Sequence, residues 1–170
     1  MKKYRLTEET TKVGNRPLYR IQALRDFGNV KEGDIGGYIE SEKNLSQDGN
    51  AWVYGNARVY GDACVYGNAW VYGNAWVSDD AWVSGNARVY GDADIKTTGD
   101  ICSMSGFGSE YRTTTAFRTK NGDVHVSCGC FQGNLEAFCQ RVESTHGNNL
   151  YGREYKKMIE MLKIHFEVEP

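Results

Sequence analysis

Side chains suited to ligand binding recur at a fixed interval along the middle of this sequence. Between Gly49 and Ala93, tryptophan, tyrosine or arginine returns in almost every unit of six residues. Tryptophan and tyrosine rings stack on planar ligands, and an arginine guanidinium pairs with phosphate. The candidate residues for binding a ligand or partner are Trp52, Tyr54, Arg58, Trp70, Tyr72, Trp76, Arg88 and Tyr90.

Groups that perform acid–base, nucleophilic or metal chemistry lie outside these units, in the C-terminal part. Cys128, Cys130 and His146 are weak candidates for a metal site, because zinc ligands usually come as paired short spacings. A cysteine nucleophile acting with His125 or His146 is a further alternative, and ordinary structural roles are the third. From the sequence we assign no catalytic residue, no metal and no cofactor.

The repeated unit, Ala-Trp-Val-Tyr-Gly-Asn, must position the aromatic residues. In an extended chain alternate residues share a face, so Ala51 and Val53 point one way and Trp52 and Tyr54 the other. Glycine and asparagine tolerate positive φ and form the corner that follows. Identical units favour a solenoid over a meander of hairpins, because a solenoid stacks like on like. Its expected inner column is Val53, Val59, Val65, Val71, Val77, Val83, Val89, Ile95 and Ile101.

These units resemble the hexapeptide-repeat, left-handed β-helix superfamily. In that family an aliphatic residue points inward and a small residue stands two positions before it, as Val53 and Ala51 do here. The resemblance implies a triangular prism with three hexads per coil. Toward the N-terminus, a weaker continuation places Leu45 and Ile39 at small-residue positions and Ile35 at an aliphatic position.

The superfamily's known activities depend on histidines in or beside the coils. Its acyltransferases use a histidine base with acyl-coenzyme A, and its γ-class carbonic anhydrases hold zinc with several histidines. Between Ala51 and Ile101 this sequence has neither a histidine nor an inserted loop. The resemblance therefore carries over the scaffold and leaves the activity open.

Three hexads per coil would arrange the outward side chains in columns on three faces. We call the first face the aromatic plate; its residues are Trp52, Tyr54, Trp70, Tyr72, Arg88 and Tyr90. The second face would carry Arg58, Trp76 and Asp94, and the third Cys64, Trp82 and Asp100. Because a large apolar surface is rarely left in water, we expect the plate to be covered by the C-terminal segment or a second copy, or to bind a ligand.

The segments on either side of the repeat are expected to cap it. We predict a mainly β protein, a left-handed parallel β-helix of about three to four coils with an N-terminal β cap and a C-terminal ββαα unit. The predicted domains are 1–34 for the cap, 35–102 for the β-helix and 103–170 for the ββαα unit.

Composition excludes several functional classes. The net charge of −2 offers no basic field for duplex nucleic acid, and no apolar run is long enough to span a membrane. The N-terminus lacks the apolar region of a secretory signal, and five irregularly spaced cysteines suit a reducing cytoplasm.

The beginning of the chain is also similar to small phage and prophage proteins often labelled hexapeptide transferases. We therefore predict a non-catalytic phage-type protein of the bacterial cytoplasm, a homodimer or homotrimer. It would bind a host protein or sequester a nucleotide-like ligand, with a counter-defence role implied by the resemblance. One alternative is an acyl-coenzyme A-dependent acyltransferase using His125 or His146 as its base; another is a structural self-assembly module.

Overall fold

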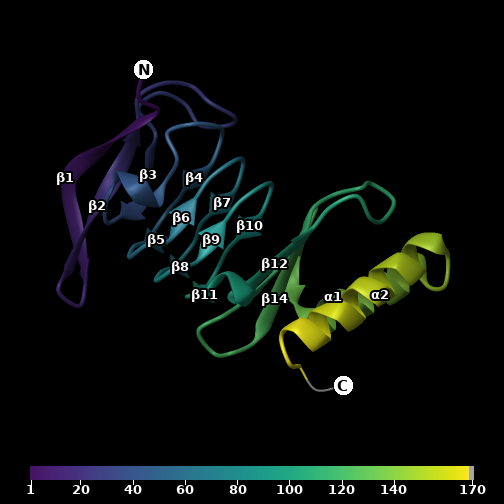
Figure 1. Ribbon diagram of the computed structural model, residues 1–170. Coiled ribbons are helices and arrows are strands. Elements are labelled where there is room, and N and C mark those ends of the chain that lie inside the picture. The colour runs from purple at the N-terminus through teal and green to yellow at the C-terminus, as the bar shows by residue number, and fades with distance from the viewer. Residues whose placement is uncertain (169–170) are drawn as a thin grey trace.

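The computed structural model describes residues 1–168, in which a β-solenoid leads into a separate sheet with two helices (Figure 1). The solenoid has three short parallel strands per coil, as the family resemblance implies. Its first face contains β4 (Trp52–Val53), β7 (Trp70–Val71) and β10 (Arg88–Val89). The second contains β5 (Arg58–Val59), β8 (Trp76–Val77) and β11 (Asp94–Ile95), and the third β6 (Cys64–Val65) and β9 (Trp82–Val83).

Strand pairing confirms the coil length of 18 residues. Trp70 pairs with Trp52 and with Arg88, and the valine that follows each residue pairs in the same register. The inner valines from Val53 to Val89 are fully buried, and the alanines beside the corners are at most 1% exposed. Each buried valine contributes roughly 1.5–3 kcal/mol, so this column is the core of the domain.

The corners also stack from coil to coil. Gly73 has φ +76°, and a β carbon added there would lie 2.9 Å from the backbone nitrogen of Gly91 in the next coil. Asparagines form a ladder along one corner, in which Asn50 Nδ2 donates to Asn68 Oδ1 and Asn68 Nδ2 to Asn86 Oδ1, both at 3.1 Å. The close approach of Gly73 to the backbone of Gly91 therefore requires glycine at position 73, which lies at a different corner from the asparagine ladder.

The N-terminal segment extends the second face instead of closing the end of the prism as a separate unit. β1 (Tyr4–Val13), β2 (Arg16–Ala23) and β3 (Ile35–Ile39) are antiparallel, and β3 then pairs in parallel with β5. A short 3-10 helix, η1 (Glu42–Asn44), follows. Because β3 pairs with β5, the second face has no free strand edge at the first coil.

The predicted register of the first coil is wrong. Ile39 pairs with Val59 and Leu45 with Val65, so both occupy aliphatic positions instead of small-residue positions, and Ile35 is 44% exposed. Eight residues instead of six separate Leu45 from Val53. The insertion has a function in packing, since the side chain of Gln47 accepts the backbone N–H of Lys3 at 2.8 Å.

The C-terminal unit contains more strands than the sequence predicted. Its antiparallel sheet consists of β12 (Ile101–Met104), β13 (Thr114–Arg118), β14 (Val124–Cys128) and β15 (Phe131–Asn134). The 3-10 helix η2 (Thr98–Asp100) precedes β12, which pairs with β13, so Asp100 does not extend the third column of the solenoid.

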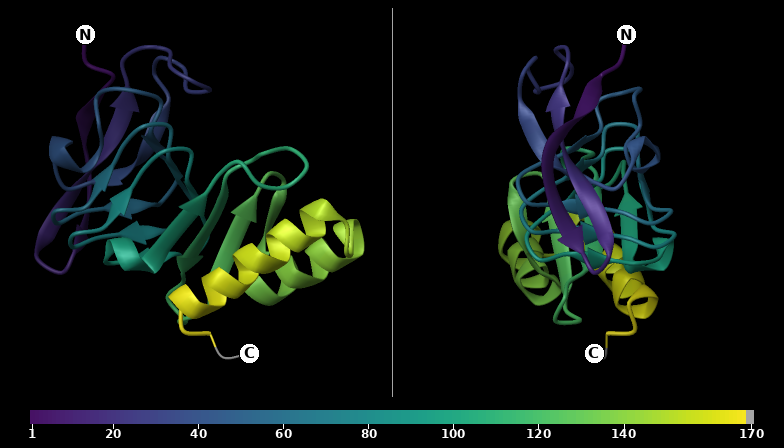
Figure 2. Two further views of the ribbon diagram at one scale, coloured as in Figure 1. Left: turned by 45° about the vertical axis from the view of Figure 1, so that its right-hand side comes forward. Right: turned by 90° about the vertical axis from the view of Figure 1, so that its left-hand side faces the viewer.

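Two helices lie side by side against this sheet (Figure 2). They are α1 (Leu135–His146), which Asn134 caps and Gly147 ends, and α2 (Leu150–His165). Their buried residues include Phe138, Ile159 and Leu162. The sheet covers the last coil, where the backbone N–H of Lys120 donates to the carbonyl of Asp92 at 3.0 Å.

Candidate functional site

The first coil of the aromatic plate is covered by the N-terminal segment. Trp52 is fully buried, and its ring makes edge contacts with Phe27 at 5.3 Å and Tyr4 at 6.2 Å between centroids. The sequence predicted that the plate would be covered from the C-terminal side or by a second copy. Trp52 instead packs as a core residue, out of reach of a ligand.

The last coil of the plate contacts the C-terminal sheet. Tyr90 Oη donates to the carbonyl oxygen of Val126 at 3.1 Å, and its ring meets Phe117 edge-on at 5.1 Å. Burial raises the pKa of Tyr90 to about 12, so the phenol stays protonated as a donor. Gln132 Nε2 donates to Tyr72 Oη at 2.6 Å and fixes the neighbouring ring.

Between these two covered ends, the middle of the plate is open. Tyr54 stacks on Trp70 with centroids 6.0 Å apart and an interplanar angle of 18°, and Tyr72 stacks on Tyr90 at 6.0 Å and 28°. A hollow of about 340 Å³ lies over these rings, within the range of small-molecule sites. We call it the aromatic groove; its lining residues are Asn29, Tyr54, Trp70, Tyr72 and Arg88.

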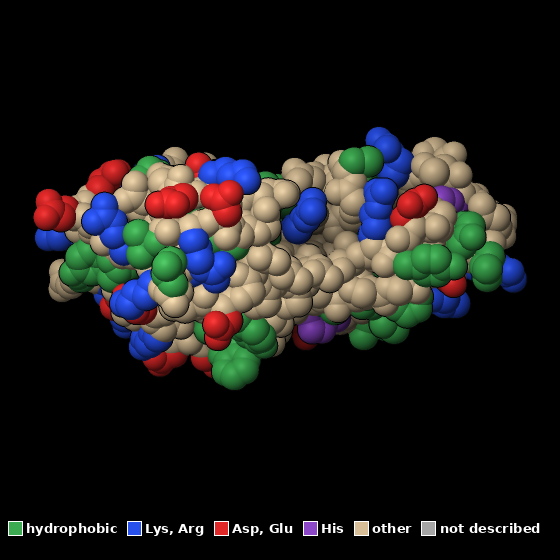
Figure 3. All heavy atoms as spheres, turned by 90° about the horizontal axis from the view of Figure 1, so that it is seen from above, with side chains coloured by type: hydrophobic (Ala, Val, Ile, Leu, Met, Phe, Trp, Pro, Cys, Tyr) green, Lys and Arg blue, Asp and Glu red, His purple; other side chains and the backbone are tan. Residues whose placement is uncertain are grey.

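A second hollow continues from Arg88 toward the C-terminal sheet. This waist hollow has a volume of about 550 Å³, and its lining residues are Asn86, Arg88, Glu110, Tyr111, Arg112, Thr113 and Gly129. Figure 3 shows the constriction between the two halves of the molecule, with lysine or arginine side chains on both sides of it. Arg88 lines both hollows, so they meet at this residue, and we refer to the two together as the depression.

The charged groups in the depression favour an anion. Arg88 is exposed, and no carboxylate within residues 1–168 forms an ion pair with it. Arg112 has only a long contact with Glu110, 3.8 Å between Nη2 and Oε2, and both side chains are more than half exposed. Exposed pairs of this kind are weak, so Arg112 is readily available to a phosphate.

Tyr111 adds an aromatic wall to the waist hollow. Its side chain is 68% exposed, and its backbone has φ +51°, which is uncommon for a residue with a β carbon. Strain of this kind persists where the surrounding structure imposes it and is concentrated at binding sites.

The remaining candidates of the aromatic set lie on the second face. The Arg58 guanidinium lies 5.3 Å from the Trp76 ring centroid, and Lys120 Nζ lies 4.8 Å from the same ring. Trp76 is therefore occupied by two cations of its own chain, and neither Trp76 nor Arg58 reaches the aromatic groove.

Cys128, Cys130 and His146 line one pocket of about 220 Å³ beside α1. Cys128 Sγ accepts a hydrogen bond from Thr114 Oγ1 at 3.2 Å, and His146 stacks on Tyr155 at 5.6 Å. Within residues 1–168, no group of three or more histidine, cysteine or acidic residues is placed to hold a metal ion. The five cysteines are free thiols.

His125 lies apart from both hollows. Its ring is 6.0 Å from Tyr90 and 6.3 Å from Phe117, and its Nδ1 is buried without a hydrogen-bond partner among the described residues. The structure thus brings neither candidate base into the aromatic groove.

The aromatic groove and the waist hollow are also lined by residues that the repeat pattern does not reveal. Asn29 comes from the N-terminal segment, and Tyr111 and Arg112 come from the connection between β12 and β13. These positions carry no periodic signal, so only the folded chain brings them to Arg88.

The fold and the sequence repeat define a β-solenoid built from six-residue units. The family model described as YdcK Beta solenoid repeat matches residues 51–67 and 63–79. A curated protein of Escherichia coli (strain K12), "Uncharacterized acetyltransferase YdcK", is 40% identical over 62 residues, which cover 32% of this chain. The match spans only 19% of that protein, so it does not concern the whole relative.

Membrane insertion through a helix has no support in the structure. Neither α1 nor α2 is long and apolar enough to cross a bilayer, and these are the α-helices of residues 1–168.

Proposed function

We propose that this protein is a non-catalytic binding protein whose aromatic groove and waist hollow hold a nucleotide-like ligand. The planar ring lies over Tyr54, Trp70 and Tyr72, and the phosphate lies between Arg88 and Arg112. One observation carries the proposal. Within the described residues, the open part of the aromatic plate ends at Arg88, and this arginine lines both hollows.

The chemistry of the lining explains why binding is favoured over catalysis. Tyr54, Trp70 and Tyr72 offer apolar ring faces, which bind planar ligands by stacking. The two arginines supply positive charge and planar sets of hydrogen-bond donors that suit a phosphate. His125 and His146 lie outside the linings of both hollows.

Isothermal titration calorimetry with AMP, ATP, a cyclic dinucleotide and acetyl-coenzyme A tests the proposal. Trp70→Ala should weaken binding of the best probe by roughly 5- to 150-fold, since stacking contributes about 1–3 kcal/mol per ring. Arg88→Gln should weaken it and flatten its dependence on salt. Trp82→Ala and Lys12→Gln are matched controls, because both side chains are exposed away from the groove.

Two results would contradict the proposal. One is the absence of binding by every probe, with no rise in melting temperature on addition of ligand. The other is binding by the Trp70 and Arg88 variants at the affinity of the unmodified protein.

Acyl transfer is the second candidate function, supported by the printed name of the curated relative. Coenzyme A contains an adenine nucleotide, so the same groove suits it. If acetyl-coenzyme A alone raises the melting temperature by several degrees, this candidate replaces the first. His125→Gln and His146→Gln then test the base, with release of the free thiol as the measurement.

Location and origin remain proposals as well. Five free cysteines agree with a reducing bacterial cytoplasm. Phage origin, a host-protein partner and a counter-defence role stay predictions from the resemblance, and a pulldown from bacterial cytoplasm tests the partner.

A further inference from the structure

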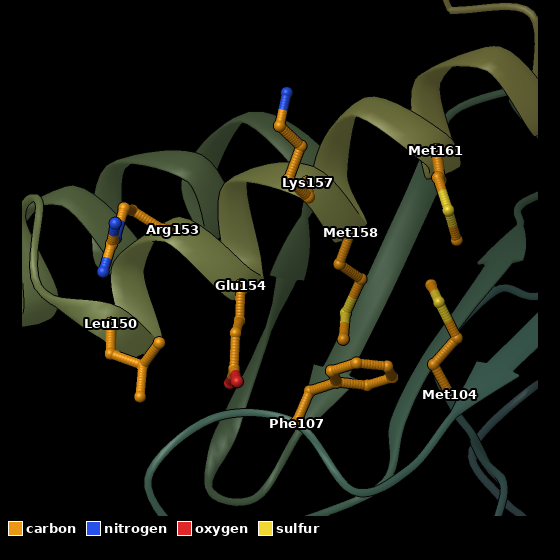
Figure 4. A pocket seen from close by; sticks show the side chains of 8 residues that line it. All are labelled: Met104, Phe107, Leu150, Arg153, Glu154, Lys157, Met158 and Met161. Atoms are coloured by element: carbon orange, nitrogen blue, oxygen red, sulfur yellow. The ribbon is translucent and has the colours of Figure 1, made fainter.

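Helix α2 has an outer face whose side chains no other part of residues 1–168 buries. A pocket of about 440 Å³ separates this helix from the connection after β12, and its lining residues are Met104, Phe107, Leu150, Arg153, Glu154, Lys157, Met158 and Met161 (Figure 4). Glu154 Oε2 accepts the backbone N–H of Gly108 at 2.8 Å and fixes the connection against the helix.

The outer face of α2 carries large exposed apolar side chains. Leu150 and Met161 are each 57% exposed, and Ile164 is 78% exposed. Together with Lys157 they form a set whose successive members are seven, four and three residues apart, which places them on one side of the helix. In chain order the set is Leu150, Lys157, Met161 and Ile164. Tyr155, Ile159 and Leu162 occupy the opposite side and are buried against the sheet and α1.

Charged residues of both signs accompany this apolar stripe in a symmetric order. Leu150 and Ile164 stand seven residues before and after Lys157, while Arg153 stands four before it and Glu160 three after it. Arg153 forms no ion pair within residues 1–168, and Glu160 Oε2 contacts Lys157 Nζ at 2.8 Å.

We propose that a second copy of this chain covers the face, with the two α2 helices antiparallel about a twofold axis near Lys157. This axis reverses the direction of the partner helix but leaves corresponding flanks of the two helices on the same side of the interface. Leu150 therefore meets the partner's Ile164, and Arg153 meets the partner's Glu160, twice in each dimer. Within each chain, the ion pair with Glu160 holds the Lys157 ammonium to one side of the helix, away from Lys157 of the partner subunit.

Charge complementarity selects this occupant over a foreign peptide. A groove for an acidic or basic helix would present one sign of charge, whereas this face presents Arg153 four residues before Lys157 and Glu160 three residues after it. The methionines of the pocket, Met104, Met158 and Met161, are flexible and can adapt to the opposing side chains.

Charge reversal tests the proposed pairing, with sedimentation equilibrium as the measurement. Arg153→Glu and Glu160→Arg should each weaken self-association by at least about tenfold, because each change places like charges opposite each other at two points. The double variant R153E/E160R restores both pairs and should return to within about threefold of the unmodified protein. Lys12→Glu, on β1, is the control for net charge.

Several outcomes would overturn the proposal. These are a monomer at every concentration, single variants that associate like the unmodified protein, or a double variant that stays as weak as the singles. If circular dichroism shows that a charge variant loses helix, self-association is measured for Ile164→Ser instead, because this exposed side chain contributes little to the fold. Self-association of Ile164→Ser equal to that of the unmodified protein would then overturn the proposal. The face shares no lining residue with the aromatic groove, so ligand binding should be unchanged in all these variants.

Discussion

Lys3 provides a sharp test of how the N-terminal segment is attached to the solenoid. Its side chain is fully buried, and Nζ donates to the carbonyl oxygen of Ala51 at 2.9 Å while lying 5.1 Å from the Phe27 ring centroid. Burial, and then repulsion from Arg25, lower the pKa of Lys3 from 10.5 to about 8, against the attraction of Asp48.

The lowered pKa of Lys3 makes stability rise with pH. Below about pH 8 both states are protonated, and the folded state carries the full cost of the buried charge. As pH rises through this pKa the folded lysine becomes neutral, while the unfolded lysine stays charged until about pH 10.5. Between about pH 7 and about pH 9.5 the gain is about 2 kcal/mol, or roughly 4–8 °C in melting temperature.

Urea unfolding of the unmodified protein and of Lys3→Met across this pH window measures the effect. Methionine has one side-chain atom fewer than lysine and leaves the Ala51 carbonyl without its donor, so the difference at any one pH mixes two effects. The change of that difference with pH isolates the titration of Lys3. The pKa values of Tyr90 and Cys64 are raised in the folded protein, so these two groups make stability fall as pH rises. Their effect is the same in both proteins and cancels in the difference. Parallel stability profiles for the two proteins would refute the reasoning.

Two matched pairs test the rest of the fold by urea unfolding. Trp52→Ala should cost about 3–5 kcal/mol, because it empties a buried site. Trp82→Ala should cost about 1 kcal/mol or less, since that side chain is 57% exposed. Gly73→Ala and Gly91→Ala both place a β carbon at positive φ, at about 1–2 kcal/mol each, but only at Gly73 does the carbon meet the backbone of the next coil. Equal costs within either pair would contradict the described packing.

The interior of the solenoid could be predicted because its signal is local and periodic. Each valine from Val53 onward stands in the same six-residue context, and the strand pairs bear out the 18-residue coil. The register failed before Val53, where the hexads degenerate and Ser46–Asn50 contains two additional residues. An insertion of two residues preserves the alternation of a strand, so the inward pattern alone could not reveal it.

The candidate site was predictable only in part. Tyr54, Trp70, Tyr72 and Arg88 belong to the repeat, and their place on one face follows from the coil length. Asn29 and Arg112 come from irregular connections whose positions depend on how the flanking segments dock. Strands β12 and β15 escaped the prediction for a related reason, since short irregular strands acquire their conformation from sheet partners and not from propensity.

A repeated solenoid presents the same surface on every coil, so a unique site must come from the features that break the repetition. Trp52 and Trp70 have the same neighbours in sequence, yet Trp52 is buried because Phe27 and Tyr4 pack on it. At the next coil Arg88 replaces tryptophan, and the C-terminal sheet covers Tyr90. The open aromatic surface of the plate is thereby confined to the rings of Tyr54, Trp70 and Tyr72, next to Arg88. The flanking segments do more than cap the solenoid: their extent sets the length of the groove, and with it the size of ligand that the groove can hold.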